Sequence, residues 1–168
     1  MTAPPTADGS YREFYDRELP AMVALAAAVT GSHLMAEDIA QDALIEAYRR
    51  WVTISSYDKP GAWLRRVTIN RALSTRRRAT AELRARPRLG AARAPALSPA
   101  PTNHDDVWAA VRALPGQQRA AVALHYLEDR PVAEIAEILG CAEGTAKVHL
   151  HRGRAALAEK LDRAEGAE

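Results

Sequence analysis

The stretch between residues 84 and 104 constrains the fold of this chain more than any other feature. It reads RPRLGAARAPALSPAPTNH from residue 86 onward, and its helical periodicity is lost. The prolines in it are Pro87, Pro95, Pro99 and Pro101. Each proline removes a backbone donor and fixes φ, and small residues separate them, as is typical of an extended linker. We therefore predict two domains, residues 1–82 and 105–168, joined by a linker over residues 83–104.

Both flanking parts have the composition of slim helical modules. Hydrophobic residues make up 48% of the chain, but many of them are alanine and only one is phenylalanine. Alanine favours helix and adds little volume to a core. No alternating pattern of a β-strand stands out. The predicted fold class is all-α: two small helical domains joined by a Pro/Ala/Arg-rich linker, the second a helix-turn-helix.

Several protein classes are excluded by simple counts. Cys141 is the only cysteine, which rules out an internal disulfide and a cysteine-rich zinc site. No apolar run reaches the roughly 18–20 residues that span a bilayer. The first ten residues, MTAPPTADGS, lack the basic and apolar parts of a secretory signal. We expect a cytoplasmic protein without membrane insertion.

The modest net charge of +2 conceals a strong pattern along the chain. Residues 1–60 have a net charge of −4 and residues 105–168 a net charge of −3. Residues 61–104 contain 10 arginines and one acidic residue, a net charge of +9. A basic middle between acidic ends predicts contact with a polyanion at the centre and a different partner for the first segment. For residues 84–104 alone, a solvated basic linker is the simpler interpretation.

The first domain should contain three helices. The first is expected over residues 11–29, with Pro20 kinking or breaking it. Ser32 is a plausible N-cap for a second helix that runs to about Trp51. Residues 52–60, VTISSYDKP, are expected to form a loop, and Pro60 suits the first position of the third helix.

The second of these helices, AEDIAQDALIEAYRRW, has one acidic stripe. Asp38, Gln41, Asp42 and Ile45 recur at i, i+3, i+4 and i+7. Paired carboxylates can serve acid–base chemistry or bind a metal, but no histidine or nucleophile of suitable spacing accompanies them. Carboxylates also repel phosphate, so a protein partner with a basic surface fits better than DNA. A merely solvated acidic face is the alternative.

The apolar side of the same helix is expected to face the core. Its residues are Ile39, Ala40, Ala43, Leu44 and Ala47.

The third helix, PGAWLRRVTINRALSTRRR, combines aromatic, amide and cationic side chains. This mixture suits nucleic acid. The residues concerned are Trp63, Asn70, Arg71, Arg76, Arg77 and Arg78. Trp63 by itself would more often be a core residue than a platform for a base.

Helices in the second domain are expected at about residues 105–113, 116–127, 131–139 and 145–162. The last two have the outline of a helix-turn-helix, with Gly140 at a turn that commonly needs positive φ. An inward stripe is predicted at Ala146, Leu150, Gly153, Leu157 and Leu161. An outward face is predicted at Gly144, Lys147, Val148, His151 and Arg152. Lys147 and Arg152 could reach phosphates or guanine edges in a major groove, although an ordinary basic hairpin has a similar outline.

His149 and His151 do not form a metal site by their spacing. Two residues apart on a helix, they point in different directions, and no acidic or cysteine partner is close. We therefore expect no metal and no cofactor.

The order of these parts resembles a known family, the extracytoplasmic-function (ECF) sigma factors, group IV of the sigma-70 family. The resemblance covers about residues 11–162. In the first domain, AEDIAQDALIEAYRRW followed by PGAWLRRVTINRAL carries it. In the second, ALPGQQRAAVALHYLEDRPVAEIAEILGCAEGTAKVHLHRGRAAL carries it.

This resemblance implies a sigma factor that binds core RNA polymerase, recognises the −10 and −35 promoter elements and promotes opening, without catalysis of its own. Its implied partners are the β′ clamp helices, the β flap, promoter DNA and an anti-sigma factor. The polymerase-binding residues that the resemblance implies are Asp38, Gln41 and Asp42, and Ile45 is added because it ends their stripe. At the −10 element the resemblance implies Trp63, Asn70, Arg71 and Ser74, and Arg76 and Arg77 are added from the cationic end of that helix. At the −35 element it implies Gly144, Thr145, Lys147, Val148, His151 and Arg152.

A conventional dimeric helix-turn-helix regulator is the alternative function. It would bind a palindromic site without polymerase, and its first domain would serve dimerisation or sensing. The separation of an acidic face at Asp38 and Asp42 from a basic helix favours the sigma factor.

Overall fold

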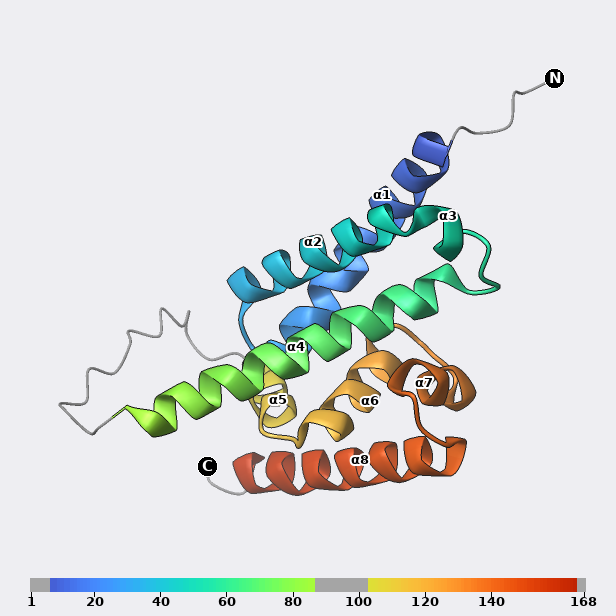
Figure 1. Cartoon of the computed structure of the whole chain (residues 1–168). Coiled ribbons are helices and arrows are strands. Elements are labelled where there is room, and N and C mark those ends of the chain that lie inside the picture. Colours follow the sequence, from blue (N-terminus) through green and yellow to red (C-terminus); the bar gives the residue numbers. More distant parts are fainter. Residues whose placement is uncertain (1–6, 87–102, 166–168) are drawn as a thin grey trace.

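The computed structural model describes residues 7–86 and 103–165 (Figure 1). The first half contains α1 (Ala7–Thr30), α2 (His33–Arg49), α3 (Trp51–Ile54) and α4 (Pro60–Ala85). The second half contains α5 (Asn103–Arg112), α6 (Gly116–Tyr126), α7 (Val132–Leu139) and α8 (Glu143–Glu165). Helices and turns account for the regular structure of these residues, which include no strand. The all-α prediction is confirmed.

Helices α1, α2 and α4 pack on one another around a shared apolar core. Met22, Leu25, Leu44 and Leu64 are fully buried in it. As predicted, Ser32 caps α2, because its hydroxyl accepts a hydrogen bond from the Met35 N–H at 3.3 Å. Pro60 likewise stands at the start of α4, as expected.

Two features of the first half differ from expectation. Helix α1 is not broken at Pro20 but continues to Thr30, because the ring lies on the exposed side of the helix and water can reach the freed carbonyl. The expected loop after α2 contains an extra turn, α3, which is held by Trp51. The indole is 8% exposed, and its N–H donates to the Ser10 hydroxyl at 2.9 Å.

Helix α4 is longer than expected. It runs to Ala85, so residues 83–85, assigned to the linker, are helical. Residues 87–102, the rest of that predicted linker, lie outside the described residues.

In the second half, α7 and α8 form the predicted helix-turn-helix. Gly140 has φ 66°, the left-handed conformation expected at this turn, and the Cys141 N–H donates to the Ala136 carbonyl at 3.0 Å. Gly153 lets α8 approach α6 closely, since a Cβ there would lie 2.6 Å from Val122 Cγ2.

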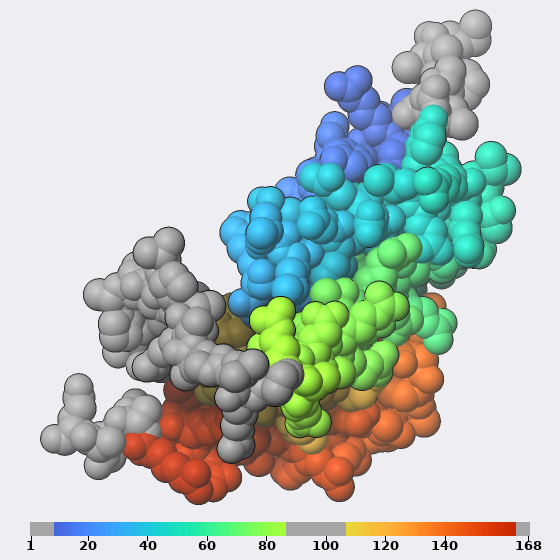
Figure 2. Space-filling model, turned by 60° about the vertical axis from the view of Figure 1, so that its left-hand side comes forward, coloured from blue at the N-terminus to red at the C-terminus, as the bar shows by residue number. Residues whose placement is uncertain are grey.

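The two halves are docked against each other. Helix α1 contacts α5 and α6, and α4 contacts α7. In Figure 2 the surface of α4 lies between those of the first helices and of the red C-terminal helix. None of the described helices combines the length and apolarity needed to span a membrane.

Candidate functional site

The acidic stripe of α2 lies on the surface as predicted. Asp38, Gln41, Asp42 and Ile45 are exposed, and Ile45 keeps 47% of its area accessible. The opposite side is buried through Ile39, Ala40, Ala43, Leu44 and Ala47. Because the core side of α2 fixes its rotation, the carboxylates must face outward.

Sequence reasoning missed the apolar part of this surface. Leu34, Tyr48 and Val52 are exposed by 75%, 53% and 84%. The signal was available, since they continue the stripe of Asp38 and Ile45 at helical spacing. Acidic and exposed apolar groups together fit a protein partner better than a merely solvated face.

On α4, Asn70, Ser74 and Arg77 share one face at i, i+4 and i+7. Asn70 and Arg77 are exposed, and Ser74 is half-buried. Trp63 begins this face and is half-buried against the core, so it is partly a packing residue. The structure brings these four predicted residues together on one side of the helix.

Arg71 is held by α2. Its guanidinium donates to Glu46 Oε2 at 2.7 Å and lies 3.8 Å from Asp42 Oδ2. Arg71, which is predicted to bind DNA, therefore lies beside Asp42, which is predicted to bind polymerase. Glu46 carries no signal in the sequence that would have singled it out.

Arg76 lies apart from the other predicted residues of α4. Six positions after Asn70, it points about 120° away from the Asn70 face. Its guanidinium donates to the Arg112 carbonyl of the second half at 2.8 Å. Burial, and secondarily the charge of Arg112, lowers the pKa of Arg76. In the docked arrangement this side chain serves the contact between the halves.

The outward face of α8 is open. The exposed residues are Gly144, Thr145, Lys147, Val148, His151 and Arg152. Ala146 and Leu150 are buried beneath this face, which confirms the inward stripe at these positions. Lys147 pairs with Glu143 at 3.1 Å, but both side chains are exposed and such pairs are weak.

A groove of about 320 Å³ lies behind the helix-turn-helix and is lined almost entirely by apolar groups. Its residues come from α5, α6, α8 and the residue that follows α6: Val107, Trp108, Val111, Val122, Ala123, Tyr126, Leu127 and Leu157. Sequence reasoning did not identify it, because it forms only when three helices meet.

Comparison with known proteins assigns both halves. Residues 14–82 match the family model Sigma-70 region 2, and residues 104–157 match Sigma-70, region 4. RNA polymerase sigma-E factor of Streptomyces coelicolor is 33% identical over 135 residues, 75% of this chain and 71% of that protein. The ECF RNA polymerase sigma factor SigE of Mycolicibacterium smegmatis is 35% identical over 172 residues. The chain belongs to the ECF sigma factors of RNA polymerase.

The SigE match covers 96% of this chain, which spans 63% of the length of that relative. Among solved structures, the sigma factor RpoE in complex with the anti-sigma factor NepR from Bartonella quintana is similar with a TM-score of 0.74 and 28% identity. It covers 91% of this chain and 97% of that one. CnrH in complex with the cytosolic domain of CnrY has the same fold, with a TM-score of 0.66 at 21% identity over 94% and 92% of the two chains.

These matches confirm the family predicted from the sequence. A conventional helix-turn-helix regulator has no reason to carry region 2, so that alternative loses its support. The individual roles of the residues on α2, α4 and α8 stay predictions.

Proposed function

We propose that this sigma factor binds core RNA polymerase through α2 and directs it to promoters through α4 and α8. The observation that carries the proposal is the position of three exposed faces on a chain matched by sigma-70 regions 2 and 4. The α2 and α8 faces were expected from their helical periodicity, and the α4 face from its mixture of aromatic, amide and cationic side chains.

The β′ clamp helices are the proposed partner of α2. Asp38 and Asp42 supply charge for a basic surface, while Leu34, Ile45 and Tyr48 supply apolar contact area. Such a mixed patch gives affinity through burial and orientation through charge.

The −10 element is the proposed ligand of the Trp63, Asn70, Ser74 and Arg77 face, with Arg71 at its border. Amide, hydroxyl and guanidinium groups can hydrogen-bond to the edges of unpaired bases, and an indole can stack on them. Arg76 joins this face only if its contact with the Arg112 carbonyl opens.

The −35 element is the proposed ligand of α8. Lys147, His151 and Arg152 lie on one exposed face, above the buried Leu150 that fixes the rotation of the helix. A helix presented in this way can enter the major groove of duplex DNA. The apolar groove around Trp108 and Leu157 is the proposed contact for the β flap.

The protein is proposed to act in the cytoplasm, without catalysis of its own. Promoter opening would then be driven by binding free energy gained on the unpaired strand, as in any ligand-driven shift between two states.

An anti-sigma factor is a further proposed partner. The similarity to RpoE in its NepR complex extends over 91% of this chain and so includes both halves. A protein that binds the docked arrangement would keep the promoter-binding faces from working together.

The test is a pull-down followed by a run-off assay. Purified protein is mixed with bacterial core polymerase and a pool of promoter fragments. We expect core binding and RNA starts at a discrete set of promoters, from which the −10 and −35 sequences can be aligned. Specific retention of duplex DNA without polymerase, and no effect on core, would contradict the proposal.

A further inference from the structure

A cluster of three side chains lies between the end of α6 and the middle of α8. Arg154 of α8 donates from Nε to the Tyr126 hydroxyl at 2.8 Å and from Nη2 to His125 Nε2 at 2.8 Å. Its guanidinium carbon is 5.5 Å from the centroid of the Tyr126 ring. The rings of His125 and Tyr126 stand edge to face, with their centroids 4.9 Å apart. None of these three residues was among the predicted site residues.

The packing of α8 on α6 brings this cluster together. The absence of a Cβ at Gly153 lets α8 approach α6 closely at Val122. His125 and Tyr126 follow Val122 by one helical turn, so they lie on the same side of α6, next to the residue that follows Gly153. The contact that packs α8 in the second half therefore also fixes the position of Arg154.

The hydrogen bonds determine which nitrogen of His125 carries the proton. A guanidinium can only donate, so His125 Nε2 must accept and is unprotonated. The proton of the neutral ring is then on Nδ1, which lies 3.4 Å from the Arg130 carbonyl oxygen, an acceptor. Both groups that hold the Arg154 guanidinium are consequently uncharged.

Arg154 thus keeps its charge and several of its donors. None of the ion pairs among the described residues includes it, whereas Lys147 on the same helix is paired with Glu143. The two hydrogen bonds leave both Nη1 hydrogens of the guanidinium available. An oriented guanidinium with unused donors and no counter-ion suits a phosphate group.

The position of Arg154 along α8 also fits a phosphate. It follows Lys147 by seven residues and His151 by three, so these three exposed side chains share one side of the helix. A recognition helix contacts base edges mainly with its N-terminal residues. A cation two turns after Lys147 therefore lies toward the wall of the groove, where the DNA backbone runs.

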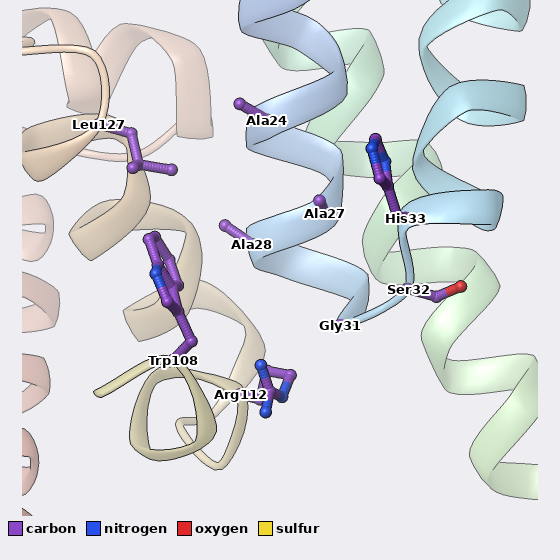
Figure 3. Close-up of a pocket in the computed structure, with 9 residues that line it drawn as sticks. All are labelled: Ala24, Ala27, Ala28, Gly31, Ser32, His33, Trp108, Arg112 and Leu127. Carbon is purple, nitrogen blue, oxygen red and sulfur yellow. The ribbon is translucent and has the colours of Figure 1, made fainter. Parts of the chain in front are cut away.

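The other arginines of the second half without a carboxylate partner among the described residues are placed differently. Arg112 lines a groove of about 330 Å³ between α1 and α5, next to Gly31 (Figure 3). Arg119 is buried, and its guanidinium donates to backbone carbonyls. Arg152 is exposed, but no hydrogen bond to the described residues orients it. Arg154 differs from all three because it is both exposed and oriented.

We propose that Arg154 binds a phosphate of the −35 site, and that His125 and Tyr126, which lie outside the recognition helix, are positioning residues that orient its guanidinium toward the DNA backbone. A phosphate contact carries no sequence information, so Arg154 sets affinity while residues nearer the start of α8 read the bases. The phosphate contact rests on the proposed function of α8, but the cluster that holds Arg154 does not.

The salt dependence of promoter binding tests the phosphate contact. Holoenzyme is assembled from core polymerase and the full chain. Its affinity is measured for a promoter fragment that gives a discrete RNA start and for the same fragment with a scrambled −35 element. Each phosphate contact adds about 0.9 to the steepness of log affinity against log salt. Arg154→Gln should therefore lower that steepness by about 1 and weaken both fragments by the same factor.

The matched control is Arg163→Gln. It makes the same change in charge on α8, but Arg163 is paired with Glu159 and should leave the salt dependence unchanged. An unchanged salt dependence in Arg154→Gln would overturn the phosphate contact. A loss confined to the fragment with the intact −35 element would also overturn it, because Arg154 would then read a base.

A double-mutant cycle tests the positioning role. Tyr126→Phe keeps the ring, which also lines the apolar groove, and removes the hydroxyl that accepts from Arg154. We expect several-fold weaker binding in the otherwise wild-type chain and no further loss in Arg154→Gln, because a positioning residue acts only through the residue that it orients. An equal loss in both backgrounds would refute positioning.

Substitutions of His125 provide the conservative rescue. His125→Leu removes the acceptor for Arg154 and should weaken binding as Tyr126→Phe does. His125→Gln restores an acceptor and should recover most of that loss. If the two His125 variants bind equally weakly, the hydrogen bond to Arg154 is not what His125 contributes.

The wild-type protein separates this inference from the proposed function. Holoenzyme that does not discriminate the intact from the scrambled −35 element would overturn the proposed role of α8, and with it the phosphate contact. Holoenzyme that prefers the intact element, with an unchanged salt dependence in Arg154→Gln, would overturn the phosphate contact alone.

Discussion

The two helices proposed to touch promoter DNA are in different states. On α8 the charged contact of the outward face is the local pair of Lys147 with Glu143. On α4, Arg71 is held by Glu46 of α2, and Arg76 is held by the Arg112 carbonyl of the second half. The orientation of the α8 side chains depends on packing within the second half, whereas Arg71 and Arg76 of α4 are held by other helices. A change in how the halves dock should therefore free Arg76 on α4 and leave the exposed side chains of α8 unchanged.

The largest effect is expected on α2, whose acidic residues border the α4 face. The double substitution Asp38→Lys and Asp42→Lys should abolish core-polymerase binding, since it places two cations on a face proposed to meet a basic surface. Both side chains are exposed, so the fold should persist. A pull-down with core polymerase measures the loss, and circular dichroism checks the fold.

The matched control for that experiment is Glu13→Lys with Asp16→Lys. These two residues are exposed on α1 and give the same change in net charge away from the α2 face. Equal loss of core binding in both double variants would show a non-specific charge effect and remove the assignment of α2.

A second experiment sharpens the contrast between α8 and α4. Lys147→Ala with Arg152→Ala should weaken −35-dependent initiation by about 1–3 kcal/mol per lost base contact, without changing stability, because both side chains are exposed. Arg71→Ala should weaken initiation and also free Oε2 of Glu46, whose Oε1 stays paired with Arg50 at 3.3 Å. Run-off assays on promoters with and without a −35 element separate the two.

The contrast would be broken by one result in particular. If the α8 variant lost as much activity on promoters without a −35 element, its residues would not read that element.

Local features of this protein were predictable from the sequence because they depend on local periodicity. The burial of Leu44 and Leu150, the cap at Ser32 and the positive φ of Gly140 each depend on residues within a few positions. The expected effect of Pro20 depended on more than local sequence. Proline is tolerated better where its side of the helix faces solvent, and the sequence around Pro20 does not say which side that is.

Contacts between distant residues were not predictable in this way. Arginine is usually found at protein surfaces, yet Arg65 is buried. It pairs there with Glu18 and Glu128, which are 47 and 63 positions away in the sequence. Arg76 was assigned to DNA from its charge alone, and only the placement of Arg112 diverts it. The α2 and α8 faces could thus be predicted from the sequence, whereas on α4 the sequence indicated the kinds of side chain but not which of them share a face.

Two glycines of α8 offer a smaller test of how that helix is held. A Cβ at position 153 would lie 2.6 Å from Val122 Cγ2 and 3.5 Å from the Gln118 carbonyl, whereas nothing lies within 4 Å of one at position 144. Gly153→Ala should cost about 1–3 kcal/mol of unfolding free energy through overpacking. Gly144→Ala should be neutral or stabilising by up to about 1 kcal/mol, from helix propensity. Urea denaturation measures both, and an equal effect of the two would contradict the packing of α8 on α6.

The smallest effect is expected at high pH and in the first half only. Burial, with the neighbouring Tyr15 and Tyr48, raises the pKa of Tyr11 to about 12. Its hydroxyl donates to the Leu44 carbonyl at 2.7 Å, a bond that the phenolate cannot make. Because the folded-state pKa lies above the unfolded value of about 10, the contribution of Tyr11 to stability is complete below pH 10 and is lost as the pH rises to 12.

Tyr11→Phe isolates this contribution. The variant should be less stable than wild type at pH 8, where it lacks the hydrogen bond, and the difference between the two should shrink from pH 10 to pH 12. Urea titrations followed by tryptophan fluorescence suit the measurement, since the Trp51 ring lies 5.4 Å from that of Tyr11. A difference that stays constant across this range would mean that Tyr11 ionises as freely in the folded protein as in the unfolded chain. Since Tyr11 packs against α2 and α3, its ionisation should loosen the packing of α1 on these two helices and leave α8 unaffected.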